Sequence, residues 1–246
     1  MFEGLKEALQ YVNGLKEDSM QPIVTEIAGK TYCNKDLTRY DREDLAKAIH
    51  VNTLSAMVDY ITGKREELRE KMILHIVSPK EVSLYSGLLK ERNRETLFVC
   101  DAIVNEFQFD KYYNQERFLI ELQANFAEND DLKTIMQVAG NIQAGTTASY
   151  SDDGISQKTT IKTGVQRVDV QVPNPVKLIP YRTFAEIEQP SSLYVFRVKD
   201  DGNGAPMFKL VEADNGLWKH AAMLKIKDYF EHELSDVYEE NLTIIA

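Results

Sequence analysis

Residues 72–104, MILHIVSPKEVSLYSGLLKERNRETLFVCDAIV, hold three short apolar runs close together in the chain. The runs cover residues 72–78, 81–86 and 96–104, and they are separated by Ser78-Pro79 and by the charged stretch 90–95. Runs of this length at this spacing favour an antiparallel meander over strands joined by long crossovers. The sequence therefore predicts a mostly antiparallel sheet at the centre of the fold.

Helical patterns lie on both sides of this sheet. The spacing of apolar residues predicts helices over residues 2–12, 39–64, 114–126, 129–142 and 216–234. In the second of these, Leu45, Ile49, Met57, Val58 and Ile61 fit one helical face that Gly63 ends, and HVNT at 50–53 is a point where it divides into two helices. In the last, we expect these residues on the inner side: Trp218, Ala222, Ile226, Tyr229, Phe230 and Leu234.

Further strands are expected outside the meander. Residues 22–34 predict a short hairpin around Gly29-Lys30, and residues 191–200 and 206–214 predict another around the loop DGNGA. The apolar tail 241–246 is expected to add a strand at a sheet edge.

Residues 143–169 are rich in Thr, Ser, Gln and Gly and predict an extended polar hairpin with its turn at Asp153-Gly154. Disorder is the alternative for this stretch. The predicted class is α+β, a mostly antiparallel sheet with packed helices and a long polar β-hairpin. With no Gly-, Ser- and Pro-rich linker, we expect one domain over 1–246, in which residues 1–35 are a candidate N-terminal arm.

The segment VPNPVKLIPYRTFAEIEQP, residues 172–190, holds four of the seven prolines. Proline cannot donate to a β-ladder, and it pushes the preceding residue into an extended conformation. We therefore expect an edge or crossing strand, with Val172, Val176, Leu178 and Tyr181 toward a core. The alternative is a rigid rim that presents Lys177 and Arg182 to a partner or an anion.

Composition excludes some classes of function. No run of 18 apolar residues exists in the 246, and the N-terminus lacks the basic start and apolar run of a secretory signal, so we expect a cytoplasmic protein without a membrane partner. The net charge of −10 disfavours wholesale binding to nucleic acid. We expect Cys33 and Cys100 to be two buried thiols, with a disulfide as the alternative.

No pattern in the chain predicts catalysis, a metal site or a cofactor. The four histidines share no ligand spacing, and phosphate-loop, dinucleotide and nucleophile-elbow motifs are missing. His232 is expected on a helix surface and His75 at a half-buried strand position. The apolar setting of Cys100, with Asp101 beside it, predicts a raised thiol pKa and low reactivity.

A charge asymmetry supplies the candidate binding residues. Between residues 155 and 182 the only acid is Asp169, whereas residues 228–240 are rich in acids. The two segments predict either complementary patches that steer self-association or two solvated faces. The candidates for anion or partner binding are Lys158, Lys162, Arg167, Lys177 and Arg182, with Tyr150 and Tyr181 as residues that could stack on a base.

Several segments together resemble a known family. They are VNTLSAMVDYI (51–61), NQERFLIELQANF (114–126), MQVAGNIQAG (136–145), DDGISQKTTIKTG (152–164), VQVPNPVKLIPYRTFAEIEQPSSLYVFRV (170–198) and FKLVEADNGLWKHAAMLKIKDYF (208–230). Their order resembles the YfdQ-type family of phage and prophage proteins, a domain of unknown function. The resemblance covers most of residues 50–235 and leaves out the first 35.

The resemblance implies a protein of temperate phages, often encoded near recombination and early genes, that acts in the bacterial cytoplasm. It supplies no catalytic residues. The leading hypothesis is a non-enzymatic accessory protein that works as a homo-oligomer, such as a ring or shell. The alternatives are a binder of a small phosphate-bearing ligand such as a defence signal nucleotide, a recombination helper that binds single-stranded DNA, a docking site for a host protein, and an enzyme with a site that sequence patterns do not reveal.

Overall fold

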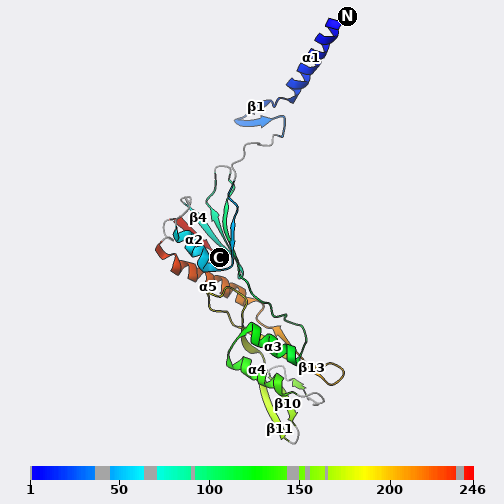
Figure 1. Ribbon diagram of the computed structural model, residues 1–246, viewed down its shortest axis with the longest axis vertical. Helices are drawn as coiled ribbons and strands as arrows, with labels where there is room; N and C mark the ends of the chain where they lie inside the picture. Colours follow the sequence, from blue (N-terminus) through cyan, green and yellow to red (C-terminus); the bar gives the residue numbers. More distant parts are fainter. Residues whose placement is uncertain are drawn as a thin grey trace. The chain divides into compact units, whose positions relative to one another are not determined.

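The computed structural model describes residues 2–36, 45–63, 71–89, 92–142, 150–152, 156–163, 166–236 and 241–246 (Figure 1). The chain divides into two compact units, Met1–Leu45 and Ala46–Ala246. The boundary at Leu45 lies beyond residue 35, where the sequence suggested that an arm ends. Each unit is described by itself below.

The described part of the first unit, residues 2–36, has one helix and one hairpin, as the sequence predicted. Helix α1 covers Phe2–Met20, and strands β1 (Val24–Ile27) and β2 (Lys30–Cys33) pair antiparallel. Ala28 and Gly29 form the turn, one residue before the predicted Gly29-Lys30, because Lys30 already pairs with Ile27. Their φ of 51° and 73° is the left-handed conformation that a two-residue hairpin turn requires. The prediction of two buried thiols is wrong for Cys33, which is a free and exposed cysteine at the end of β2.

The second unit contains two five-stranded sheets. The first has the order β15-β4-β5-β6-β3, and its centre is the predicted meander of β4 (Met72–Ser78), β5 (Glu81–Ser86) and β6 (Thr96–Asp101). The C-terminal strand β15 (Leu242–Ile245) pairs in parallel with β4 at one edge, which confirms the predicted edge strand.

The other edge of this sheet corrects a prediction. Ile49–Val51 is strand β3, which pairs in parallel with β6, and helix α2 begins only at Leu54 and ends at Gly63. Leu45 and Ile49 therefore do not share a helical face with Met57 and Ile61. Ile49 and Val51 are β-branched and suit a strand, and the new helix begins where Asn52 and Thr53 interrupt the apolar pattern.

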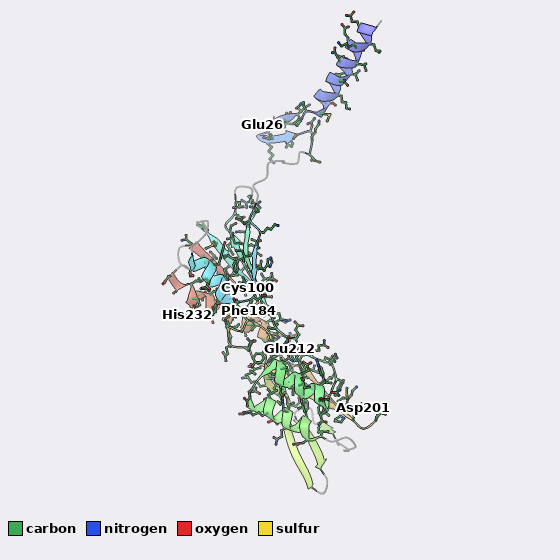
Figure 2. The ribbon with its side chains drawn as sticks, viewed as in Figure 1. Glu26, Cys100, Phe184, Asp201, Glu212 and His232 are labelled. Carbon is green, nitrogen blue, oxygen red and sulfur yellow. The ribbon has the colours of Figure 1, made fainter. Side chains whose placement is uncertain are left out.

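Helices α2 and α5 (Leu217–Glu233) cover the first sheet, with α5 against β4 and α2 against β6. Ala222, Ile226, Phe230 and Leu234 are fully buried, so most of the predicted inner side of α5 is confirmed, while Trp218 and Tyr229 are half-buried. Cys100 and Phe184 lie in the same core (Figure 2). His75 is half-buried and His232 is exposed, as predicted.

The second sheet has the order β7-β14-β13-β12-β8. It is formed by β7 (Tyr113–Asn114), β8 (Phe126–Ala127), β12 (Val176–Pro180), β13 (Ser192–Asp200) and β14 (Pro206–Glu212). The predicted helices α3 (Gln115–Asn125) and α4 (Asp130–Asn141) are confirmed, and their apolar faces share one core with this sheet. Phe118 of α3 stacks on Phe208, with 5.3 Å between ring centroids.

The proline-rich segment is a crossing strand inside this sheet. Val176–Leu178 pair with β13, after which Ile179 and Pro180 pair with β8 on the other side. The change of partner fits the sequence because Pro180 has no N–H to donate. Val176 and Leu178 are buried as predicted, but Tyr181 is 47% exposed and does not face a core.

The polar segment forms a three-stranded sheet of its own, not a single hairpin. Its order is β11-β10-β9, from β9 (Tyr150–Asp152), β10 (Ser156–Thr163) and β11 (Gln166–Pro173). Asp153-Gly154 and residues 143–149, which the prediction included, lie outside the described residues. The longest pairing is between β10 and β11 and extends to Pro173, past the expected end at residue 169.

Candidate functional site

The sequence-predicted binding residues fall into two groups. Tyr150, Lys158, Lys162 and Arg167 belong to the polar sheet, where Lys162 pairs with Arg167 near one end of the β10–β11 ladder. The structure describes the backbone of these four residues. Lys177, Tyr181 and Arg182 lie on β12 or directly after it.

Lys177 has an exposed side chain, but its backbone holds a helix in place. Its N–H donates to Asp131 Oδ2 at 2.7 Å, and its carbonyl accepts from Asn129 Nδ2 at 2.7 Å. Asn129 also caps α4, since its Oδ1 accepts from the Leu132 N–H at 2.8 Å. The position therefore joins β12 to the first turn of α4.

Arg182 is buried, so it is not presented at a surface as a rim residue would be. Its Nη1 donates to Tyr194 Oη at 2.9 Å and to Glu212 Oε1 at 3.0 Å, and its Nη2 donates to the Pro190 carbonyl at 3.2 Å and to Ser192 Oγ. The four terminal N–H groups are therefore all used within the protein. Figure 2 marks Glu212, which forms the ion pair that balances the buried charge.

Burial and nearby charges shift the pKa of Arg182 in opposite directions. Desolvation lowers the pKa of Arg182 below its ordinary value, and the charges of Tyr194, Glu212 and Asp214 oppose this shift in part. Burial also raises the pKa of Tyr194, so its hydroxyl stays protonated at neutral pH. Arg182 therefore remains a cation whose charge is already paired.

One donor of Arg182 has no partner. A guanidinium has five N–H groups, and the fifth, at Nε, is buried without a hydrogen bond among the described residues. An unsatisfied buried donor costs about 1–3 kcal/mol, and more when it is charged. Such a donor in a native fold calls for an acceptor, either an ordered water molecule or a ligand.

Arg182 lines a small pocket of about 200 Å³. Four of the ten lining residues are aromatic and come from distant segments: Phe107 and Phe109 from the connection before β7, Tyr181 after β12, and Trp218 in the first turn of α5. The guanidinium lies over the Trp218 ring, with 3.8 Å between the guanidinium carbon and the ring centroid. Asn105 and Asn125 add amide groups, and the ion pair of Lys80 and Glu106 also lines the pocket.

A second space of about 700 Å³ adjoins this pocket, because Asn105, Asn125 and Tyr181 line both. Its lining contains Glu186 and no lysine or arginine. The Glu186 carboxylate accepts from the Leu54 N–H at 2.7 Å and so holds the start of α2.

A metal site, a membrane-spanning helix and a reactive thiol have less support in the described residues. Among them no group of three or more His, Cys, Asp and Glu is placed to hold a metal ion, and no helix found there is long and apolar enough to cross a membrane. Burial, Glu186 and Asp101 raise the pKa of Cys100 to about 12, so the thiol is uncharged at neutral pH.

Sequence reasoning found Tyr181 and Arg182 but missed their pocket partners. Phe107, Phe109, Trp218 and the two asparagines come from three separate segments, and no local motif links them. Comparison of the chain with models of protein families, with curated proteins and with solved structures finds no significant match.

Proposed function

We propose that the protein is a non-enzymatic accessory protein that works as a homo-oligomer, and that α1 and the hairpin of β1 and β2 join its copies. The observation that carries the proposal is the exposure of the apolar stripe on α1. Leu5, Leu9, Val12 and Leu15 are 59%, 57%, 58% and 52% exposed. Large apolar surfaces of this kind mark sites of association.

The spacing of the stripe fits a second copy of the same helix. Leu5, Ala8, Val12 and Leu15 follow one another by three, four and three residues, as in a coiled-coil seam, and Leu9 widens it. In a parallel pair Gly4 would meet Leu9 and Tyr11 would meet Lys16 of the other copy, so no like charges are brought together. Helix propensity adds little to the stability of α1, since Gly4 and Gly14 each cost about 1 kcal/mol relative to alanine. Packing against a second copy must therefore supply most of the free energy that keeps α1 helical.

The hairpin of the first unit supports the same proposal. Among the described residues, β1 and β2 pair only with each other, and Val24, Ile27 and Tyr32 are at least half exposed. A lone two-stranded hairpin is marginally stable in water, and its open edges can pair with another chain. Both elements of the first unit therefore gain stability if copies associate.

The charge distribution supplies a further reason for self-association. Residues 155–177 carry four lysine and arginine residues against one acid, and residues 228–240 carry an excess of acids. Opposite charges on two parts of one chain favour head-to-tail contacts between copies, which close into rings or shells. The assignment to phage or prophage proteins of the bacterial cytoplasm depends on the resemblance of the quoted segments alone.

The test compares two double variants of the full chain. Leu9→Glu with Val12→Glu places two charges in the stripe, and Gln10→Glu with Asn13→Glu places the same charges, three residues apart, at polar positions outside it. Native mass spectrometry of the wild type is expected to give a discrete multiple of 28.1 kDa. The first variant should become monomeric and the second should not.

Two outcomes would overturn the proposal. A wild-type protein that remains a monomer at tens of micromolar has no assembly to explain. Equal loss of assembly in both double variants would mean that added charge, and not the stripe, is responsible.

A further inference from the structure

We propose that the pocket beside Arg182 binds an uncharged, planar heteroaromatic ring that carries a hydrogen-bond acceptor, and that the adjoining space holds a neutral hydroxylated substituent. A nucleoside has this chemistry. The proposal is independent of the assembly proposed above.

The need for an acceptor follows from the five donors of Arg182. Four of them are satisfied by Tyr194, Glu212, Pro190 and Ser192, and only Nε is left without a partner among the described residues. Because Nε carries one N–H, a single carbonyl oxygen or ring nitrogen satisfies it. A phosphate or carboxylate would normally be held by two parallel N–H groups of an arginine, and Arg182 has no second one to offer.

The walls and the volume favour a flat ring. Phe107, Phe109, Tyr181 and Trp218 provide aromatic surfaces, and the guanidinium of Arg182 lies over one face of the Trp218 ring. Stacking of a base on an aromatic side chain contributes about 1–3 kcal/mol. The pocket of about 200 Å³ is somewhat larger than the ~150 Å³ apolar cavity that admits benzene. It therefore has room for one ring.

The charges favour a neutral ligand. Arg182 is paired with Glu212 and Lys80 with Glu106, so both cations that line the pocket are already in ion pairs. The adjoining space of about 700 Å³ has a carboxylate and no lysine or arginine in its lining. A phosphate on the substituent would be desolvated there without a cation, which is costly. Ribose hydroxyls, in contrast, match the amides of Asn105 and Asn125 that line both spaces.

The chain has one tryptophan, and it lies in the wall of this pocket. Its fluorescence therefore reports binding directly. Uridine and adenosine are titrated against the full-length protein, with UMP and AMP as their charged counterparts and benzoate as a planar anion. We expect saturable quenching by at least one nucleoside, with at least a threefold higher Kd for its monophosphate and no saturation by benzoate.

Two single variants locate the site. Tyr181 is 47% exposed, so Tyr181→Ala removes one wall of the pocket at little cost to folding. It should raise the Kd at least tenfold. Tyr11→Ala is the matched control, because Tyr11 is also exposed but lies in the first unit, and its Kd should equal that of the wild type.

A measurement on the arginine itself avoids a variant that fails to fold. The Nε–H of Arg182 is buried, so its signal in a ¹H–¹⁵N spectrum of the arginine-labelled protein is protected from exchange. The nucleoside that quenches Trp218 should shift this signal and slow its exchange further.

The proposal is overturned by three results. The first is quenching that rises linearly and equally in wild type and Tyr181→Ala. The second is tighter binding of the monophosphate than of the nucleoside. The third is an Arg182 signal that no nucleoside changes, which would assign its fifth donor to an ordered water only.

Discussion

Arg182 and Trp218 lie face to face, with the guanidinium carbon 3.8 Å from the centroid of the indole ring. Arg182 follows β12 of the second sheet, and Trp218 belongs to the first turn of α5, which packs on the first sheet. Phe184, two residues after Arg182, is buried in the core that includes residues of α2 and α5. The segment after β12 therefore contributes Arg182 to the pocket with Trp218, and Phe184 to the core of the first sheet.

The first prediction concerns this arginine. Arg182→Met keeps an unbranched chain but leaves the Glu212 carboxylate and the hydroxyls of Tyr194 and Ser192 without their donor. We expect the free energy of unfolding to fall by about 2–4 kcal/mol, measured by urea denaturation followed through Trp218. Lys177→Met, at an exposed side chain, should change it by less than about 0.5 kcal/mol. Similar losses in both variants would contradict the structural role of Arg182.

The second prediction concerns the aromatic core of the second sheet. Phe118 is fully buried, and its ring stacks on Phe208 at 5.3 Å and on Phe196 at 6.0 Å. Phe118→Ala leaves a cavity between α3 and the sheet, so the free energy of unfolding should fall by about 3–5 kcal/mol. Ile120→Ala on the same helix is the control, because Ile120 is 50% exposed. A larger loss in the control would mean that α3 packs by its other face.

The third prediction separates two roles of Asn129. Its Oδ1 caps α4, and its Nδ2 donates to the Lys177 carbonyl on β12. Asn129→Asp retains the cap oxygen and removes the amide donor, whereas Asn129→Ala removes both. We expect Asn129→Ala to lower the free energy of unfolding by about 1–3 kcal/mol, with Asn129→Asp in between. Equal losses, measured by the same urea denaturation, would show that the helix cap contributes nothing here.

The local patterns of the sequence predicted most elements of the fold. The meander at 72–104, the helices α3 and α4 and most of the inner side of α5 depend on residues close together in the chain, and the structure has them as expected. The error at Ile49 has a physical reason. A short β-branched run next to a helix fits both periodicities, and only the pairing of β3 with β6 decides between them.

The candidate site was predicted only in part, because its parts meet through tertiary structure. Arg182 was selected for its charge in a basic segment, but its charge is neutralised by Glu212, thirty residues further along the chain. Trp218, Phe107 and Asn125 gave no signal as binding residues, since aromatic residues in a helix or a connection usually pack in a core. Nothing local in the sequence reveals that one N–H of an arginine lacks a partner.

The fourth prediction concerns the reactivity of the two thiols. Cys33 is exposed and Cys100 is buried, and both are free. With a disulfide-exchange reagent at pH 8, one thiol per chain should react rapidly and the second only at the rate of unfolding. Cys33→Ser should abolish the rapid phase. Two rapid thiols in the wild type would contradict the burial of Cys100.

The fifth prediction is a dependence of stability on pH that comes from Cys100. Its pKa is raised from 9.0 to about 12 in the folded protein, chiefly by burial and then by Glu186 and Asp101. Above pH 9 the unfolded chain loses this proton while the folded chain keeps it, so the unfolded state binds fewer protons and stability falls as pH rises. The contribution is complete below pH 9 and is lost by about pH 12.

Comparing Cys33→Ser with Cys33→Ser/Cys100→Ala isolates this effect from the titration of lysines and tyrosines. Between pH 8 and pH 10.5 the single variant should lose about 1–2 kcal/mol more than the double variant, because each pH unit above the unfolded pKa costs up to about 1.4 kcal/mol per retained proton. Glu186→Gln in the Cys33→Ser background removes a charge that raises this pKa, so it should reduce the difference. Parallel pH profiles in the single and double variants would mean that the Cys100 thiol ionises in the folded protein as readily as in the unfolded chain.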